Sequence, residues 1–303
     1  MRVMDYKKIF KSRELRHTIL RILGIVPDRT MLKIQYKIKL GRKLNLKSPE
    51  RFTEKLQWYK INYRNDVLKK CVDKYAVREY VEEKGLSEIL VKLYGVYDSI
   101  DDVDVSVLPD KFVLKTTNGG GGLNVFICKD RNTFDKSKVR DQIGKLREYR
   151  AGDDGREWAY TGVKPKIIIE EYLENSENSE AGVNDYKFLC FNGRPEYVIV
   201  DVNRFVDHKR NFYGIDWSYK EVSSDHENLG DTLEKPEGYE DMVAVAAKLS
   251  EDFPFVRVDL YSVNGKTYFG ELTFYPWSGY VQFTPDEFDF ELGEKMVLPE
   301  VKR

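Results

Sequence analysis

The sequence has 303 residues, of which 41% are hydrophobic and 33% are charged, and this composition excludes a disordered or fibrous chain. Its 50 Lys and Arg residues balance 51 Asp and Glu residues, so the whole chain lacks the excess positive charge typical of a nucleic-acid-binding protein. No segment approaches the ~20 apolar residues of a membrane span, and the basic start lacks the apolar stretch of a signal peptide. We therefore expect a cytoplasmic protein without a nucleic-acid partner.

Cysteine and histidine are few and widely spaced. No two cysteines form a CxxC pair, and no histidine stands at metal-ligand spacing from a cysteine. We therefore expect reduced thiols, and neither a disulfide framework nor a zinc site. The residues concerned are Cys71, Cys128, Cys190, His17, His208 and His226.

The positive charge is concentrated at the N-terminus. Residues 1–60 contain 17 Lys and Arg residues against five Asp and Glu residues, a net charge of +12, so the remainder carries −13. This asymmetry indicates either an anionic partner, such as a membrane surface, or pairing with the acidic remainder of the chain. Residues 5–65 are predicted to be helical, with Ser48 as a cap and Pro49 at the first position of a helix. A second helix is predicted from Asp66 to Lys84, ending at Gly85.

From about residue 88 the chain has short β-rich runs separated by turns. The last long helix is predicted over Tyr239–Ser250, and two strands follow it. Asn264-Gly265 between them is a strong signal for a two-residue hairpin. Strands and helices do not alternate regularly, so we expect an α+β protein with antiparallel sheets rather than a doubly wound fold.

A glycine-rich segment lies between two predicted strands in residues 111–129. Lys115 ends the first strand, and glycines at such a position let backbone N–H groups close around phosphate oxygens. The segment is not a P-loop, because no GK[ST] motif follows and the next element is a strand. The alternative is a flexible hairpin tip. The phosphate-binding candidates here are Lys115, Asn118, Gly119, Gly120, Gly121 and Gly122.

Charged residues recur with a period of two on the last two predicted strands. Arg257 and Asp259 share one face of the first strand, and Glu271 and Thr273 share one face of the second. The hairpin would bring Asp259 and Glu271 together, which is costly unless a cation such as Mg²⁺ lies between them. The alternative is an exposed sheet face with ion pairs.

A third candidate is the apolar run of residues 167–174, which ends in acids. It is either a core strand that emerges at the surface or a strand whose end contacts adenine and ribose.

In this order, these segments resemble the ATP-grasp superfamily over roughly residues 70–280. Five further segments are similar to the TupA-like ATP-grasp group, which is linked to bacterial teichuronopeptide, capsular and cell-wall polysaccharide synthesis. They are FTEKLQWYK (52–60), DKYAVREYV (73–81), NDYKFLCFNG (184–193), HKRNFY (208–213) and FPFVRVDLY…YFGELTFYPWSGY (253–280). The resemblance implies two α+β subdomains that close over ATP, at residues 66–170 and 171–303, after a basic helical region at 1–65.

The resemblance also implies roles for individual residues. Lys74 and Lys115 match the lysines that hold ATP phosphates, and Lys187 matches a further nucleotide contact more loosely. Arg257 matches the arginine that ligases place against the acyl phosphate. The hinge that meets adenine and ribose corresponds to Glu170, Glu171 and Leu173, and the Mg²⁺ ligands to Asp259, Glu271 and Thr273. Many relatives have Asn at the position of Thr273, and a hydroxyl is a weaker Mg²⁺ ligand than an amide oxygen.

The implied function is an ATP- and Mg²⁺-dependent carboxylate–amine ligase that forms an acyl phosphate on an envelope polysaccharide precursor. Its substrates would be an amino acid and a sugar or polysaccharide precursor. Alternatives are an ATP-dependent sugar kinase and a non-catalytic nucleotide-binding module. The candidate site for an anionic substrate, with a solvated loop as its alternative, consists of Arg204, His208, Lys209 and Arg210.

Overall fold

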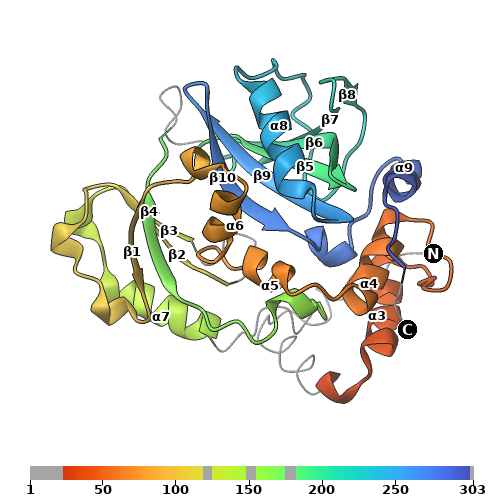
Figure 1. Ribbon diagram of the computed structural model, residues 1–303, viewed down its shortest axis with the longest axis horizontal. Coiled ribbons are helices and arrows are strands. Elements are labelled where there is room, and N and C mark those ends of the chain that lie inside the picture. The colour runs from red at the N-terminus through yellow and green to blue at the C-terminus, as the bar shows by residue number, and fades with distance from the viewer. Residues whose placement is uncertain (1–22, 119–124, 148–154, 175–181, 301–303) are drawn as a thin grey trace.

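Two antiparallel sheets lie on either side of a pair of short helices (Figure 1). The computed structural model describes residues 23–118, 125–147, 155–174 and 182–300. The four-stranded sheet has the order β1-β4-β2-β3 and the six-stranded sheet the order β10-β9-β5-β6-β7-β8. Neighbouring strands run antiparallel throughout both sheets, which confirms the predicted α+β class.

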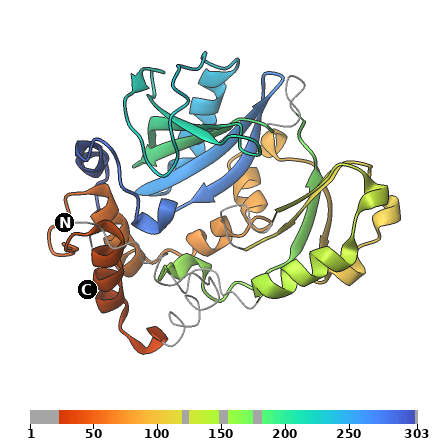
Figure 2. The same ribbon diagram turned by 180° about the vertical axis from the view of Figure 1, so that it is seen from behind.

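The four-stranded sheet packs one face against helix α7 (Lys136–Arg147), as Figure 2 shows from behind. Phe112, Leu114 and Ile169 of the sheet form a core with Val139 and Ile143 of the helix. Period-two alternation of apolar residues places these side chains on one face of the strands. The strands are β1 (Leu93–Tyr97), β2 (Phe112–Thr116), β3 (Val125–Cys128) and β4 (Ile167–Glu171).

The six-stranded sheet carries helix α8 (Tyr239–Ser250), whose predicted bounds are confirmed. On that face the ring of Phe188 lies 6.0 Å from that of Tyr239. On the opposite face Phe52 of helix α4 (Phe52–Asn62) packs edge-on against Phe255 at 5.0 Å. The strands are β5 (Asp185–Phe191), β6 (Arg194–Val202), β7 (Lys209–Gly214), β8 (Tyr219–Lys220), β9 (Phe255–Val263) and β10 (Lys266–Thr273).

The predicted hairpin between β9 and β10 is confirmed. Val263 pairs with Lys266, and Asn264 and Gly265 both have positive φ, at 52° and 71°. Further along the ladder Phe269 pairs with Leu260 and Glu271 with Asp259, so Gly270 is an extra residue in a β-bulge. A Cβ on Gly270 would lie 2.9 Å from the carbonyl oxygen of Asp259, which leaves room only for glycine.

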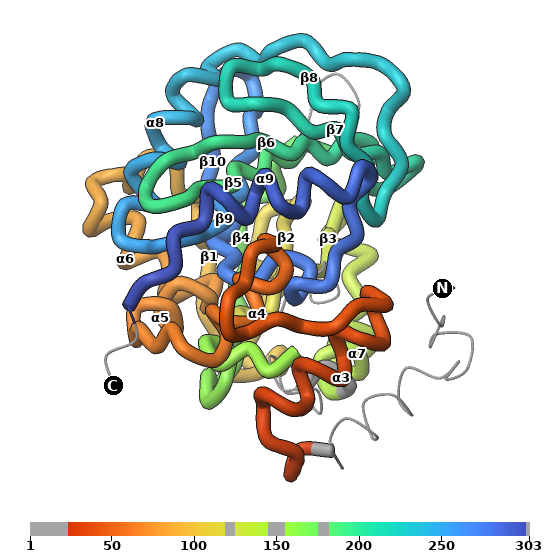
Figure 3. The backbone as a smooth tube through the Cα atoms, turned by 90° about the vertical axis from the view of Figure 1, so that its right-hand side faces the viewer, coloured from red at the N-terminus to blue at the C-terminus, as the bar shows by residue number. Residues whose placement is uncertain are grey.

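The described N-terminal helices lie beside helix α9 (Glu287–Lys295), at the end of the molecule that Figure 3 turns toward the reader. They are α3 (Asp28–Leu40) and α4, so the prediction of helix in this region is confirmed for these spans, whereas residues 5–22 lie outside the described residues. The predicted start of α4 at Pro49 is wrong. The helix begins at Phe52, because the Glu54 carboxylate accepts the backbone N–H groups of Glu50 and Arg51 and fixes the cap there.

The single helix predicted over residues 66–84 is also wrong, because it is interrupted. Helix α5 (Val67–Val72) and helix α6 (Val77–Glu83) are separated by a turn in which Asp73 accepts backbone N–H groups of Tyr75 and Ala76, both at 2.9 Å. The predicted end at Gly85 is confirmed, with φ of +66°. Both helices pack in the core of the six-stranded sheet, where the ring of Tyr80 lies 5.7 Å from that of Phe253.

The predicted division of the chain at residues 65/66 and 170/171 stays a prediction. Among the described helices, none is long and apolar enough to cross a membrane.

Candidate functional site

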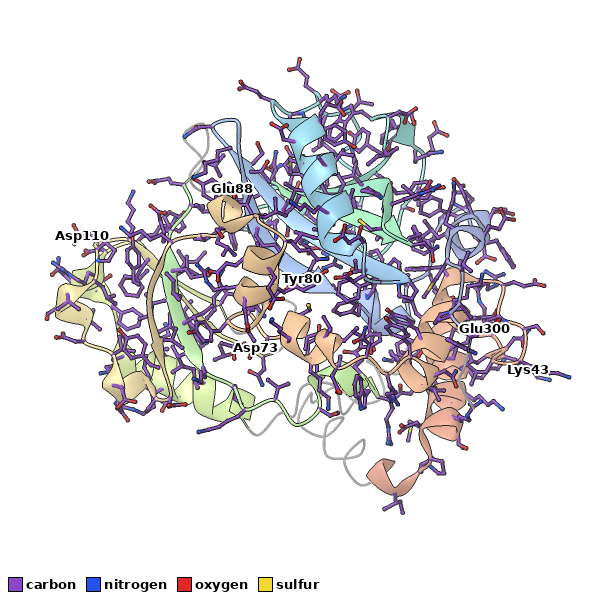
Figure 4. All side chains as sticks on the ribbon, viewed as in Figure 1. Lys43, Asp73, Tyr80, Glu88, Asp110 and Glu300 are labelled. Carbon is purple, nitrogen blue, oxygen red and sulfur yellow. The ribbon has the colours of Figure 1, made fainter. Side chains whose placement is uncertain are left out.

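A pocket lies where the α5–α6 turn meets strands of both sheets. Figure 4 shows Asp73, at the end of α5, between the two sheets. Lys74 reaches the pocket from the turn between α5 and α6, and Arg78 reaches it from α6. Lys115 and Glu170 come from the four-stranded sheet, and Gly270 comes from the bulge of β10. Its remaining lining residues are Leu90, Val91 and Phe269. The pocket therefore brings Lys74 and Lys115, which were predicted to bind phosphate, near Gly270, which precedes the predicted metal ligand Glu271.

Glu170 organises one wall of the pocket. Its side chain is 7% exposed, and its two carboxylate oxygens accept hydrogen bonds from Lys115 at 2.7 Å and from Arg78 at 3.2 Å. A buried carboxylate requires such partners, because an unpaired charge there would be costly. The pairing fixes two cationic side chains in one orientation. Arg78 was missed in the sequence, although it lies one helical turn after Lys74.

Lys74 is held at the interruption between α5 and α6. Its backbone N–H donates to the carbonyl of Thr117 at 2.9 Å, which ties the turn to the chain just after β2. Burial lowers the pKa of Lys74, Glu271 is the charge that opposes this most, and Lys115 lowers the pKa further. Lys74, Lys115 and Glu271 are therefore close enough to influence one another electrostatically.

Arg257 joins the two predicted metal carboxylates. It donates to both oxygens of Asp259 at 2.7 Å, and its Nη2 lies 3.3 Å from Glu271 Oε1 and 3.2 Å from Thr273 Oγ1. Asp259 and Glu271 are direct cross-strand partners, as expected from the hairpin. These four side chains thus share one sheet face, opposite the face that carries α8.

Asp259 is almost fully buried, at 1% exposure. Burial alone would raise the pKa of Asp259, but Arg257 and Lys187 hold it below its usual value. Burial would likewise lower the pKa of Arg257, and Asp259 and Glu271 raise it instead. Both groups are therefore charged at neutral pH.

Glu271, Arg257 and Asp259 form a row of charged side chains across β10 and β9, and Lys187 continues this row onto β5. Its ammonium group lies 2.8 Å from Asp259 Oδ2 and 2.5 Å from Asp185 Oδ2. Arg204 also donates to Asp185 Oδ2, at 2.9 Å. Burial raises the pKa of Asp185, and the two cations oppose this rise. Asp185 was missed in the sequence, although a period of two from Lys187 places it on the same face.

The row ends on β7 and the loop that follows β8. Arg210 forms a bidentate pair with Asp201, at 2.6 and 2.9 Å, and also donates to Asp225. His208 Nε2 lies 3.3 Å from Asp201 Oδ1. Lys209 is not brought together with Arg204, His208 and Arg210. Successive strand residues point to opposite faces, and Lys209 pairs instead with Glu227, at 2.8 Å.

Other predicted nucleotide contacts are placed only in part. Glu171 ends β4 with an exposed side chain, and its backbone N–H donates to the carbonyl of Lys92 at 2.9 Å. Leu173 follows the strand and is partly buried. The backbone carbonyl of Asn118 accepts a hydrogen bond from Thr116 at 3.4 Å. Gly119, Gly120, Gly121 and Gly122 lie outside the described residues.

A family model described as TupA-like ATPgrasp matches residues 54–297 of the sequence. The chain belongs to the TupA-like ATP-grasp family. The match includes the pocket and the row of charged side chains. Family membership confirms the expected fold: a mixed α+β protein of the ATP-grasp type.

Several solved ligase structures are similar to this chain. D-alanine–D-alanine ligase from Helicobacter pylori is 16% identical with a TM-score of 0.45, and the match covers 82% of this chain and 67% of the ligase. The Bacillus anthracis enzyme is 18% identical with a TM-score of 0.40, and the match covers 67% of this chain and 57% of the ligase. L-amino acid ligase from Bacillus licheniformis is 14% identical with a TM-score of 0.41, and the match covers 69% of this chain and 42% of the ligase. The chain thus spans little more than half of the Bacillus anthracis ligase. A comparison with curated proteins finds no match.

The TM-scores lie below 0.5, so the family assignment rests on the sequence match. It makes the chain a member of the ATP-grasp class.

Proposed function

We propose that this TupA-like ATP-grasp enzyme uses ATP to activate a carboxylate as an acyl phosphate and then joins the acyl group to an amine. The product would be an amide on a precursor of a cell-envelope or capsular polysaccharide. One observation carries the proposal: Lys74 and Lys115 line a pocket that is also lined by Gly270 of β10. The next residue, Glu271, contacts Arg257 and raises the pKa of Lys74 electrostatically. This arrangement supplies positive charge and carboxylate oxygens on either side of a transferring phosphoryl group.

The chemistry requires two steps. A carboxylate oxygen of the acid attacks the γ-phosphorus of ATP, the bond to the β-phosphate oxygen breaks, and ADP leaves. The amine nitrogen then attacks the acyl carbon, the bond to the phosphate oxygen breaks, phosphate leaves, and the nitrogen loses a proton. Lys74 and Lys115 would hold the phosphates, and Arg257 would stabilise negative charge on the acyl phosphate oxygens. Lys187 would be a further nucleotide contact, and the hinge at Glu170, Glu171 and Leu173 would meet adenine and ribose.

Asp259, Glu271 and Thr273 offer two carboxylates and a hydroxyl on one sheet face, an oxygen set that suits Mg²⁺ shared with nucleotide phosphates. Arg257 contacts both carboxylates, and this need for positive charge between them supports Mg²⁺ as a further cation at the site. When bound, Mg²⁺ would neutralise phosphate charge. Thr273 also donates to Glu271 at 3.3 Å and so orients that carboxylate.

The substrate would lie along the row of charged side chains that runs from β10 to β7. Arg204, His208 and Arg210 adjoin this row, and Lys209 would take part only from the other face of β7. The basic N-terminal region would hold the enzyme at the inner face of an anionic membrane, where envelope precursors are commonly linked to lipids. The enzyme would otherwise be cytoplasmic.

Product analysis tests this proposal. The full-length protein is incubated with MgATP, candidate uronic acids and candidate amino acids, and ADP, phosphate and new amides are measured. We expect ADP and phosphate only when both an acid and an amine are present. Phosphate transfer to a sugar hydroxyl without any amine would overturn the proposal in favour of a sugar kinase. Binding of ATP without turnover of any pair would favour a non-catalytic module.

A trapping reaction checks the intermediate. Hydroxylamine is a small nucleophile that attacks acyl phosphates and gives stable hydroxamates. We expect ATP-dependent hydroxamate formation from the acid that supports amide synthesis. Amide formation with release of AMP and pyrophosphate would contradict an acyl phosphate.

A further inference from the structure

Asp185 carries an unusual oxygen atom at the centre of the row of charged side chains. Its side chain is 3% exposed, and Oδ2 accepts hydrogen bonds from both Lys187 and Arg204. Oδ1 is buried, yet no hydrogen-bond donor reaches it from the described part of the chain. A buried carboxylate oxygen without a donor is unfavourable, because it has lost its water without gaining a protein partner, so such an atom in a functional site indicates a missing partner.

The surroundings of Asp185 favour a positively charged organic partner over a second metal ion. A divalent cation needs several oxygen ligands, and Asp185 offers only Oδ1, because Oδ2 already accepts hydrogen bonds from Lys187 and Arg204. The proposed Mg²⁺ carboxylate Glu271 is on the far side of Asp259, on β10. A substrate ammonium group needs only one carboxylate oxygen as acceptor, which Asp185 Oδ1 supplies.

Arg204 lies at the accessible edge of this position. Its side chain is 31% exposed, and it uses Nη1 to contact Asp185, so its guanidinium group can also face a ligand that enters from solvent. A guanidinium group binds carboxylates in a bidentate manner. Arg204 belongs to a loop in which Phe205 and Val206 are both 62% exposed, and the Phe205 ring packs against Gly182, just before β5. The loop and the start of β5 are therefore adjacent.

We infer that Asp185 and Arg204 form the site for the amine substrate and that this substrate is an amino acid. Asp185 Oδ1 accepts hydrogen bonds from the α-ammonium group, and Arg204 receives the α-carboxylate. The position suits the reaction, because Asp185 pairs through Lys187 with Asp259, which Arg257 holds beside the proposed acyl phosphate. The inference deepens the proposed function and rests on it for the role of the bound amine.

Three small ligands with one carbon skeleton separate the two contacts. L-Alanine carries both charged groups, L-alaninamide keeps only the ammonium group, and L-lactate keeps only the carboxylate. Binding to the full-length protein is measured by ligand-observed NMR with Mg²⁺ and a non-hydrolysable ATP analogue present. We expect L-alanine to bind at least tenfold more tightly than either of the other two. Equal binding of all three, or binding of none, would overturn the inference.

Matched variants assign each contact. Asp185→Asn should remove the preference for L-alanine over L-lactate, and Arg204→Met should remove its preference over L-alaninamide. Asp207→Asn is the control, because Asp207 lies on the same loop, is 74% exposed and pairs only with Lys209 among the contacts that the structure describes. If Arg204→Met does not fold, Arg204→Lys replaces it, because lysine keeps the charge but loses the bidentate geometry. We then expect a smaller loss of the preference for L-alanine over L-alaninamide. Unchanged preferences in the Asp185 and Arg204 variants would contradict the inference.

Hydroxylamine separates this inference from the proposed function. It is largely uncharged at neutral pH, so trapping of the acyl phosphate does not need a bound amino acid. We expect Arg204→Met to raise the KM for the amino acid at least tenfold more than it raises the KM for the acid in hydroxamate formation. Hydroxamate formation by the wild type without amino-acid binding would overturn the inference and support the proposed function. Amino-acid binding through both residues without any hydroxamate formation would support the inferred binding site and overturn the proposed function.

Discussion

Lys60 donates hydrogen bonds to both oxygen atoms of Ser278, to the carbonyl at 2.8 Å and to the hydroxyl at 2.9 Å. A third bond joins Lys60 to the carbonyl of Gly155 at 2.8 Å. The lysine side chain is fully buried, and Trp277 and Ser278 both have positive φ, at 52° and 54°. Trp277 in turn donates to Asp225 at 3.0 Å, and Asp225 accepts from Arg210. A lysine of the N-terminal region therefore supports one end of the row of charged side chains.

Lys60→Met is expected to reduce the free energy of unfolding by about 3 kcal/mol, because two carbonyls and a hydroxyl lose their donor in a buried place. Urea denaturation measures the change. Lys55→Met is the control on the same helix, since Lys55 also bonds two carbonyls but only near the surface of α9. An equal loss in both variants would mean that burial at Lys60 has no special effect.

The same residue predicts a pH dependence. Burial lowers the pKa of Lys60 to about 7, partly offset by Glu157. Between this value and the ordinary value near 10.4, the unfolded chain binds more protons at this site than the folded chain does. Stability should therefore rise with pH from about 7 to 10 in the wild type relative to Lys60→Met. Parallel stability curves for the two proteins over this interval would show that the pKa is not lowered.

Lys115→Ala is expected to weaken ATP binding roughly tenfold to a hundredfold, because it removes a charge-assisted phosphate contact of about 1.5–3 kcal/mol. It also leaves Glu170 with Arg78 as its remaining described ion-pair partner, which adds repulsion toward phosphate. Lys111→Ala is the control, since Lys111 precedes the same strand but pairs with Glu174 at the surface. Calorimetry gives both affinities. Equal ATP affinity in the Lys115 variant and the wild type would remove Lys115 from the site.

Glu271→Gln is expected to lower ATP-dependent turnover steeply and to raise the Mg²⁺ concentration needed for half-maximal activity. The change keeps the side-chain shape and removes one negative charge from the proposed ion site. Glu240→Gln, on the surface of α8, is the matched control. Activity is followed across a magnesium titration. If the two variants respond to Mg²⁺ alike, Glu271 is not a ligand.

The full-length protein should sediment with anionic vesicles at low salt more than with neutral vesicles, and less at high salt. Each basic side chain near such a surface contributes on the order of 1 kcal/mol, and salt screens it over ~8 Å at physiological ionic strength. Some of the N-terminal charge is already paired, because Arg42 and Arg51 both contact Asp286. Lys33 and Lys37 on α3 are exposed. No difference between the two vesicle types at low salt would mean that the basic region only packs on the enzyme.

The local parts of the site could be predicted from the sequence. Asn264-Gly265 determines the hairpin, and a period of two then places Arg257 and Asp259 on one face. The break at Lys74 has a local signal in Asp73, which accepts the backbone N–H groups of Tyr75 and Ala76. The hydrogen bond from Lys74 to the carbonyl of Thr117 could not be predicted, because Thr117 is distant in the sequence. Likewise, the partners of Arg210 follow from the register of β6 and β7 and from a loop that brings in Asp225. Such pairings are tertiary and leave no local pattern.

The single extra residue in β10 determines which way the second carboxylate points. If Gly270 were paired opposite Asp259 instead of bulging out, Glu271 would lie opposite Val258, and its side chain would emerge among the apolar residues beneath α8. The meeting of Asp259 and Glu271 is thus encoded in the spacing of the backbone as well as in the identity of the acids. A substitution that forced residue 270 into the ladder opposite Asp259 would leave every proposed ligand in the sequence and still turn Glu271 away from the site. In comparing relatives of this enzyme, the glycine before the second acid is as informative as the acid itself.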